Sequence, residues 1–73
     1  MYQISYELNS QDKDYTPLFL AIKRMGNYAH PLETVWLVKT SLTMEEVSKI
    51  LTPLVDQRVD KLIVTMVSAN GMA

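Results

Sequence analysis

Hydrophobic and polar residues alternate strictly at the start of the chain. The apolar positions are Tyr2, Ile4, Tyr6 and Leu8, and the polar positions between them are Gln3, Ser5, Glu7 and Asn9. A period of two is typical of a strand with one buried face. We therefore predict a first strand over these residues and expect its polar set on the open face of the sheet.

Two later segments have the apolar spacing of amphipathic helices, i, i+3, i+4 and i+7. The apolar positions are Leu18, Ala21, Ile22 and Met25 in the first segment, and Val47, Ile50, Leu51 and Leu54 in the second. We predict that the first helix starts near Asp14, whose carboxylate can accept from free N–H groups of the first turn, and ends before Gly26. The second helix is predicted to start with a capping box, Thr43 to Glu46, and to kink or end at Pro53.

The remaining apolar runs have the composition of strands. Residues 34–40 and 61–67 are rich in strand-forming side chains and carry apolar residues on both faces. Apolar residues on both faces favour strands that are at least partly covered on both sides. A short strand over 28–30, with 31–33 near the turn, would complete a hairpin with the first of these runs. Residues 68–73 are predicted to be a short tail.

The order of predicted elements is βαββαβ, which predicts an α+β protein with a ferredoxin-like fold. In that fold the two helices lie on one face of a four-stranded antiparallel sheet, and the first and third strands are the inner ones. The chain has 73 residues, so we predict a single domain over 1–73. The bare face of such a sheet would mix polar and apolar residues, and we therefore expect a homodimer.

Composition narrows the possible chemistry. The chain has no cysteine, one histidine and a formal net charge of −1. A disulfide framework and a cysteine-based zinc site are therefore excluded. The charge lacks the basic excess that usually accompanies tight nucleic-acid binding. We recognise neither a signal peptide nor an apolar run approaching a membrane span, so we expect a cytoplasmic protein without a membrane partner.

Oxygen-bearing side chains gather where the first strand ends. Glu7 and Asn9 lie at the end of the strand, and Asp12 and Asp14 follow in the loop. Mg²⁺ prefers oxygen ligands and commonly binds one or two carboxylates together with substrate phosphate. Glu7 is the candidate catalytic residue, and Glu7 with Asn9 forms the candidate metal site. The alternative is a solvated polar strand face with a helix cap at Asp14 and ordinary loop polarity at Asp12.

A few other side chains could carry chemistry. Histidine is the side chain that most easily gains and loses a proton near neutral pH, which makes His30 a candidate general base, although His30-Pro31 is also a turn signal. Tyr6, Tyr15 and Tyr28 could stack on nucleic-acid bases, but aromatic residues on strands more often belong to a core or an interface. No residue is assigned to nucleic-acid binding.

Several runs together resemble a known superfamily. They are I-S-Y-E-L-N at 4–9, Asp14-Tyr15, Ala21-Ile22, Gly26, H-P-L-E-T-V-W-L-V at 30–38 and D-K-L-I-V at 60–64. These runs are similar to the smaller of the two core CRISPR spacer-acquisition proteins and to VapD-type toxins, above all to the short stand-alone members often labelled "SinR family". The resemblance implies a ferredoxin-like fold, a dimer formed through the sheets, and RNA or DNA as a partner.

The resemblance also bears on catalysis. Several relatives are metal-dependent nucleases that use an aspartate near the end of the first strand, one from each subunit, and Glu7 occupies the matching position. The extra methylene of glutamate moves the carboxylate oxygens by about 1 Å, and a misplacement of that size can cost roughly 100-fold in rate. We therefore leave enzymatic activity open; an active form would be an Mg²⁺-dependent endonuclease, specifically a ribonuclease.

Two hypotheses follow. The first is a small dimeric protein of this superfamily that associates with nucleic acid. The alternative is a non-catalytic protein-interaction module, such as a toxin–antitoxin or mobile-element accessory. No cofactor other than Mg²⁺ is predicted for either.

Overall fold

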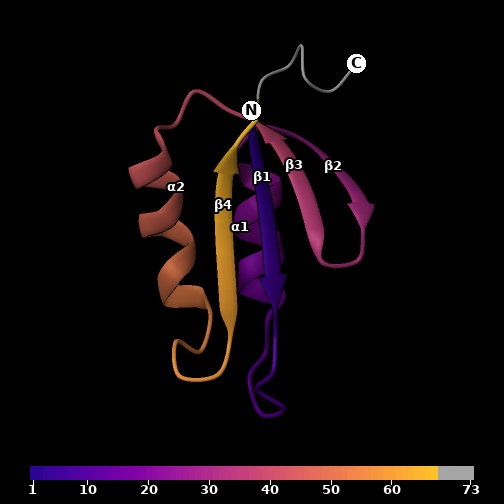
Figure 1. The fold of residues 1–73 in the computed structure, drawn as a ribbon, viewed down its shortest axis with the longest axis vertical. Coiled ribbons are helices and arrows are strands. Elements are labelled where there is room, and N and C mark those ends of the chain that lie inside the picture. Colours follow the sequence, from indigo (N-terminus) through magenta and orange to yellow (C-terminus); the bar gives the residue numbers. More distant parts are fainter. Residues whose placement is uncertain (68–73) are drawn as a thin grey trace.

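The computed structural model describes residues 1–67, which form four strands and two α-helices (Figure 1). The predicted tail at 68–73 lies outside the described residues. In chain order the elements are β1 (Tyr2–Glu7), α1 (Thr16–Arg24), β2 (Asn27–Leu32), β3 (Val35–Lys39), α2 (Met44–Leu51), a short 3₁₀ turn η1 (Thr52–Leu54) and β4 (Lys61–Met66). The protein is thus a small α+β structure, as the pattern of apolar positions predicted.

The four strands form one antiparallel sheet in the order β2-β3-β1-β4. The first and third strands are the inner ones, which confirms that part of the prediction. Ile4 pairs with Trp36 of β3 on one side and with Val64 of β4 on the other. Because directly paired residues point to the same face of a sheet, these three side chains lie together on one face.

That face carries the hydrophobic core. The buried residues form one cluster to which β1, β3, both helices and the chain after η1 contribute: Tyr2, Ile4, Tyr6, Leu18, Ile22, Trp36, Val38, Val47, Leu51 and Val55. Burying one large aliphatic side chain is worth about 1.5–3 kcal/mol. The apolar stripes of both helices therefore supply much of what holds them to the sheet. In Figure 1, α1 lies behind the sheet and α2 lies beside β4.

The opposite face of the sheet, the open sheet face, mixes polar and apolar side chains. Its polar members in β1 are Gln3, Ser5 and Glu7, as predicted from the alternation. In β3, the half-buried Val35 and Leu37 face this side, whereas Trp36 and Val38 face the core. Leu32 pairs with Val35, and Ile63 pairs with Ser5, so both belong to the open sheet face. Leu32 is 63% exposed and Ile63 is 60% exposed.

The start of α1 differs from the prediction. The helix begins at Thr16 with Tyr15 as its N-cap, so Asp14 lies one residue before the cap. Its carboxylate nevertheless accepts a hydrogen bond of 2.9 Å from the backbone N–H of Thr16. Asp14 therefore satisfies one of the free N–H groups of the first turn from outside the helix. Pro17, in the same turn, has no N–H to satisfy.

Strand β2 is longer than predicted. It continues through Pro31 to Leu32, and the turn is confined to Glu33 and Thr34. β2 is an edge strand with a register shift between Ala29 and Leu32. Proline is compatible with an edge strand because its missing N–H need not belong to a ladder. The turn signal at His30-Pro31 was therefore outweighed by pairing with β3.

Gly26 follows the C-cap Met25, as predicted, but not because it adopts a left-handed conformation: it has no positive φ. A Cβ at this position would collide with the backbone carbonyl oxygen of Lys39. Glycine is thus required here by the close approach of the helix end to β3.

The start of α2 agrees with the prediction. Thr43 Oγ1 accepts from the N–H of Glu46 at 3.2 Å, and Glu46 Oε1 accepts from the N–H of Thr43 at 3.0 Å. The α-helix ends at Leu51, and Pro53 lies within the 3₁₀ turn that follows.

Candidate functional site

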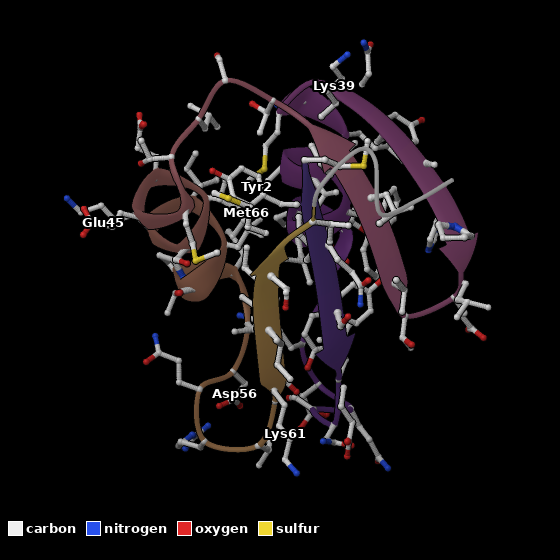
Figure 2. All side chains as sticks on the ribbon, turned by 45° about the horizontal axis from the view of Figure 1, so that its top comes forward. Tyr2, Lys39, Glu45, Asp56, Lys61 and Met66 are labelled. Carbon is white, nitrogen blue, oxygen red and sulfur yellow. The ribbon has the colours of Figure 1, made fainter. Side chains whose placement is uncertain are left out.

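Glu7 lies at the last position of β1, where it is exposed and pairs in register with Lys61 of β4. Its place in the polar alternation puts the carboxylate on the open sheet face. The lysine and glutamate are cross-strand neighbours of opposite charge, which favours their pairing without any bound ion. Figure 2 shows Lys61 at the start of β4, close to the end of β1.

Asn9 lies next to Glu7, but the side-chain atom that faces Glu7 is not one that could bind a metal ion together with the glutamate. Its side-chain Nδ2 donates to the carbonyl oxygen of Val59 at 2.8 Å and to Oε1 of Glu7 at 3.4 Å. The carbonyl of Val59 can only accept, so the amide nitrogen, not the oxygen, must point this way. A cation between Glu7 and Asn9 would need the amide oxygen there. Within one chain, therefore, this pair is arranged as a hydrogen bond.

The loop acids do not complete a metal site either. Asp12 is exposed, and Asp14 is bonded to the start of α1. The backbone N–H of Thr16 lowers the pKa of the Asp14 carboxyl. Among residues 1–67, no group of three or more histidine, cysteine, aspartate and glutamate side chains could hold a metal ion.

Asp60, immediately before β4, accepts several hydrogen bonds from the segments that lie near the end of β1. Its Oδ1 accepts from the N–H of Asn9 at 2.7 Å, and its Oδ2 accepts from the Tyr15 hydroxyl at 2.6 Å and from the N–H of Asp56 at 2.7 Å. The Tyr15 hydroxyl in turn accepts from the N–H of Ser10 at 3.1 Å. One carboxylate thus ties together the chain after β1, the start of α1 and the loop before β4.

These contacts shift the pKa values of the Asp60 and Tyr15 side chains. Burial alone would raise the pKa of Asp60, but the hydrogen bonds from Asn9, Tyr15 and Asp56 outweigh it and hold that pKa below its usual range. Burial, followed by the bond to Asp60, raises the pKa of Tyr15. Asp60 therefore stays ionised and Tyr15 stays neutral, which is a structural arrangement with no proton to exchange near neutral pH.

Sequence reasoning missed this role of Asp60. It placed the residue in the D-K-L-I-V run, but did not connect it with Tyr15. The available signal was that the residue directly before a strand paired with β1 must lie near the end of β1.

A polar hollow of about 540 Å³ lies between the loop after β1 and the loop before β4, lined in part by Asp12, Lys13, Asp56 and Arg58. Its charges balance, and Arg58 Nε is already paired with Asp56 Oδ1 at 3.2 Å. The pairing with Arg58 lowers the pKa of Asp56. Nothing in this hollow favours a ligand of either sign.

A cluster of aromatic rings surrounds Trp36, which is 2% exposed. The imidazole of His30 stacks on the indole with ring centroids 3.6 Å apart and planes 14° apart. The rings of Tyr28 and Phe19 lie 5.6 and 6.3 Å from it. The indole N–H donates to the Tyr6 hydroxyl at 2.8 Å. Tyr6 is therefore a core residue with its hydroxyl satisfied.

His30 lies on the opposite face of the sheet from Glu7, because it stacks on Trp36 of the core face. Its Nε2 lies 3.1 Å from the backbone carbonyl oxygen of Glu33, and the Tyr6 hydroxyl donates to the same oxygen at 3.1 Å. A carbonyl only accepts, so Nε2 carries a proton and is occupied. The predicted candidates thus separate into an acidic end, with Glu7, and an aromatic cluster, with His30.

Comparisons with protein-family models, with curated proteins and with solved structures found no match to this chain. Among residues 1–67, neither helix has the length and apolar character needed to cross a membrane.

Proposed function

We propose that this protein is a ferredoxin-like homodimer of the CRISPR spacer-acquisition and VapD-like superfamily that associates with nucleic acid and does not cut it. The antiparallel order β2-β3-β1-β4 supports the ferredoxin-like assignment, since that fold has the same two inner strands. The placement of Glu7 is the observation that supports the absence of cleavage, and the association with nucleic acid rests on the resemblance.

Glu7 lies at the rim of the open sheet face, beside Lys61 in register, and its carboxylate accepts a hydrogen bond from the side-chain nitrogen of Asn9. A dimer formed through this face would bring the glutamates of two subunits to the interface. Each would arrive with a cationic neighbour from its own chain, and this neighbour reduces the need for a metal ion between the carboxylates. The arrangement therefore favours an interface residue over a Mg²⁺ ligand.

The open sheet face supports the dimer. Leu32 and Ile63 are both more than half exposed, and Val35 and Leu37 lie between them on the same face. Apolar side chains gathered on one exposed surface mark an interaction site more often than scattered single residues do. A small domain also gains stability from association, because it buries a modest share of its surface alone.

Light scattering tests the dimer directly. The wild type should show about twice the 8.4 kDa mass of one chain. Leu32→Lys and Ile63→Lys should each shift the mass toward one chain, because a buried unpaired charge is costly. Leu20→Lys is the matched control, since Leu20 is exposed on α1 away from the sheet face. A wild type that stays a monomer at micromolar concentration would end the proposal of a dimer.

The second candidate, a non-catalytic protein-interaction module, is favoured by the outer edge of β4. Within the described residues this strand pairs only with β1, over all six residues, and contains neither proline nor a register shift. A groove of about 260 Å³ lies between α2 and β4, lined in part by Ser48, Leu62 and Val64. A regular strand edge can pair with a strand of another chain.

Proline scanning distinguishes the two candidates. Met66→Pro would remove one N–H from the outer edge of β4, because Thr65 and Val67 are the residues that bond to β1, whereas Met66→Val would keep it. Loss of partner capture with proline alone, without loss of the homodimer, would favour the edge of β4 over the open sheet face.

A further inference from the structure

Two exposed rings lie outside the core on strand β2. Tyr28 is 48% exposed, and His30 is also exposed. They are two residues apart in a strand, so they point to the same side of the sheet. Tyr28 pairs with Val38, which is buried in the core, so this side is the one that carries α1. The pair is therefore separate from the open sheet face.

The His30 ring is held in place before any ligand arrives. One face lies against Trp36, and Nε2 donates to the carbonyl of Glu33. Because His30 is exposed although its inner face is covered, solvent reaches the outer face. A planar ring fixed in this way can stack on another planar ring at little further cost in side-chain entropy.

A basic side chain comes from α1. Phe19 packs near Trp36, and Lys23 is four residues further along the same face of the helix. Both α1 and β3 run opposite to β1, so moving from Phe19 to Lys23 follows the direction from Trp36 to Val38. Val38 pairs with Tyr28, and from these directions we infer that Lys23 lies near the level of Tyr28.

We propose that Tyr28 and His30 form a stacking surface for unpaired bases of single-stranded nucleic acid, with Lys23 placed to contact a phosphate. Aromatic faces combined with a neighbouring cation are the usual means of binding single strands without sequence preference. A duplex hides its base faces in the stack and cannot use such a surface. This inference rests on the nucleic-acid association proposed above and adds to it a location and a strand preference.

The test is binding of an end-labelled oligouridylate, an oligothymidylate and a duplex of the same length, about ten nucleotides, followed by fluorescence anisotropy. Both single strands should bind more tightly than the duplex. A difference in affinity between the oligouridylate and the oligothymidylate would show whether RNA or DNA supplies the bases. Tyr28→Ala and His30→Ala should each weaken binding by roughly 5- to 100-fold. Lys23→Gln should weaken it and lower the salt dependence by about one ion.

Two controls match these variants. Asn27→Ala changes an exposed residue of the same strand on the opposite face, and Lys49→Gln removes one exposed positive charge from α2. Both should bind like the wild type. Tyr28→Leu keeps apolar packing against Trp36 but removes the aromatic ring, so it should reproduce the loss even if Tyr28→Ala is unstable.

The outcomes separate this site from the broader proposal. If folded wild type binds none of the three probes, both the stacking surface and the nucleic-acid association are wrong. The surface formed by Tyr28 and His30 would then be left as a site for a protein partner. Binding that Lys49→Gln weakens and Tyr28→Leu does not would keep nucleic-acid association and overturn this site. Equal affinity for duplex and single strand would overturn base stacking.

Discussion

The Tyr15 hydroxyl donates a 2.6 Å hydrogen bond to Oδ2 of Asp60, a residue 45 positions later in the chain. This bond joins the N-cap of α1 to the residue that precedes β4. It explains how the acidic end of the molecule is built. The carboxylate at its centre is Asp60, and the hydrogen bonds that it accepts are all internal.

Asp60→Asn should destabilise the fold, because the new amide group would place donors against the Tyr15 hydroxyl or a backbone N–H. We expect the melting temperature to fall by roughly 5–10 °C. Asp12→Asn, at an exposed loop position without such bonds, should leave it unchanged. Equal melting temperatures for the two variants would show that the network around Asp60 contributes nothing to stability.

Asp60 should also affect how the stability of the fold changes at acid pH. The folded pKa of Asp60 is lowered, so its contribution is present above the unfolded pKa of about 3.9 and is lost as pH falls through the folded value. The melting temperature, measured from pH 6 to pH 2, should therefore fall less steeply for Asp60→Asn than for wild type. Parallel curves would contradict the assignment.

Asp14→Ala should lower the melting temperature by roughly 3–6 °C, because the N–H of Thr16 loses its acceptor. The loss should be independent of metal. A chelator that lowered the melting temperature of the wild type and not of Asp14→Ala would replace the hydrogen-bond account with a bound cation.

Gly26→Ala should cost about 1–3 kcal/mol in free energy of unfolding, since the added methyl group collides with the Lys39 carbonyl and the backbone must shift. Denaturant titration measures this. Asn27→Ala is the control, because it changes the next residue, which is exposed and already carries a Cβ. A stabilised Gly26→Ala would mean that the unfolded chain's entropy outweighs the collision.

The last prediction concerns cleavage. Wild type, Glu7→Gln and Glu7→Asp should be compared on single-stranded RNA and duplex DNA with Mg²⁺ and with Mn²⁺. We expect no cleavage by wild type or by Glu7→Gln, because Glu7 lies opposite Lys61 in the sheet and accepts a hydrogen bond from the side-chain nitrogen of Asn9.

Two results would change this conclusion in different ways. Metal-dependent cleavage by wild type that Glu7→Gln abolishes would make the protein a nuclease. Cleavage only by Glu7→Asp would show an intact scaffold whose chemistry was lost with one added methylene.

Much of the secondary structure follows from the sequence alone. The alternation over Tyr2 to Glu7 and the capping box at Thr43 are local signals, and local backbone preferences act over a few residues. Both elements appear in the structure as predicted. The position of Pro53 after the second helix is local in the same sense.

Other features depended on contacts between distant residues. Which face of β3 is buried could not be read from 34–40, because both faces are apolar; pairing of Trp36 with Ile4 decided it. The reason for glycine at position 26 lies in the carbonyl of Lys39, and the role of Asp60 lies in Tyr15 and Asn9. Likewise, the sequence places His30 beside a proline, but only the fold stacks it on Trp36. Side chains far apart in the chain acquire these roles when the sheet assembles, since hydrogen bonding and packing depend on distance in space.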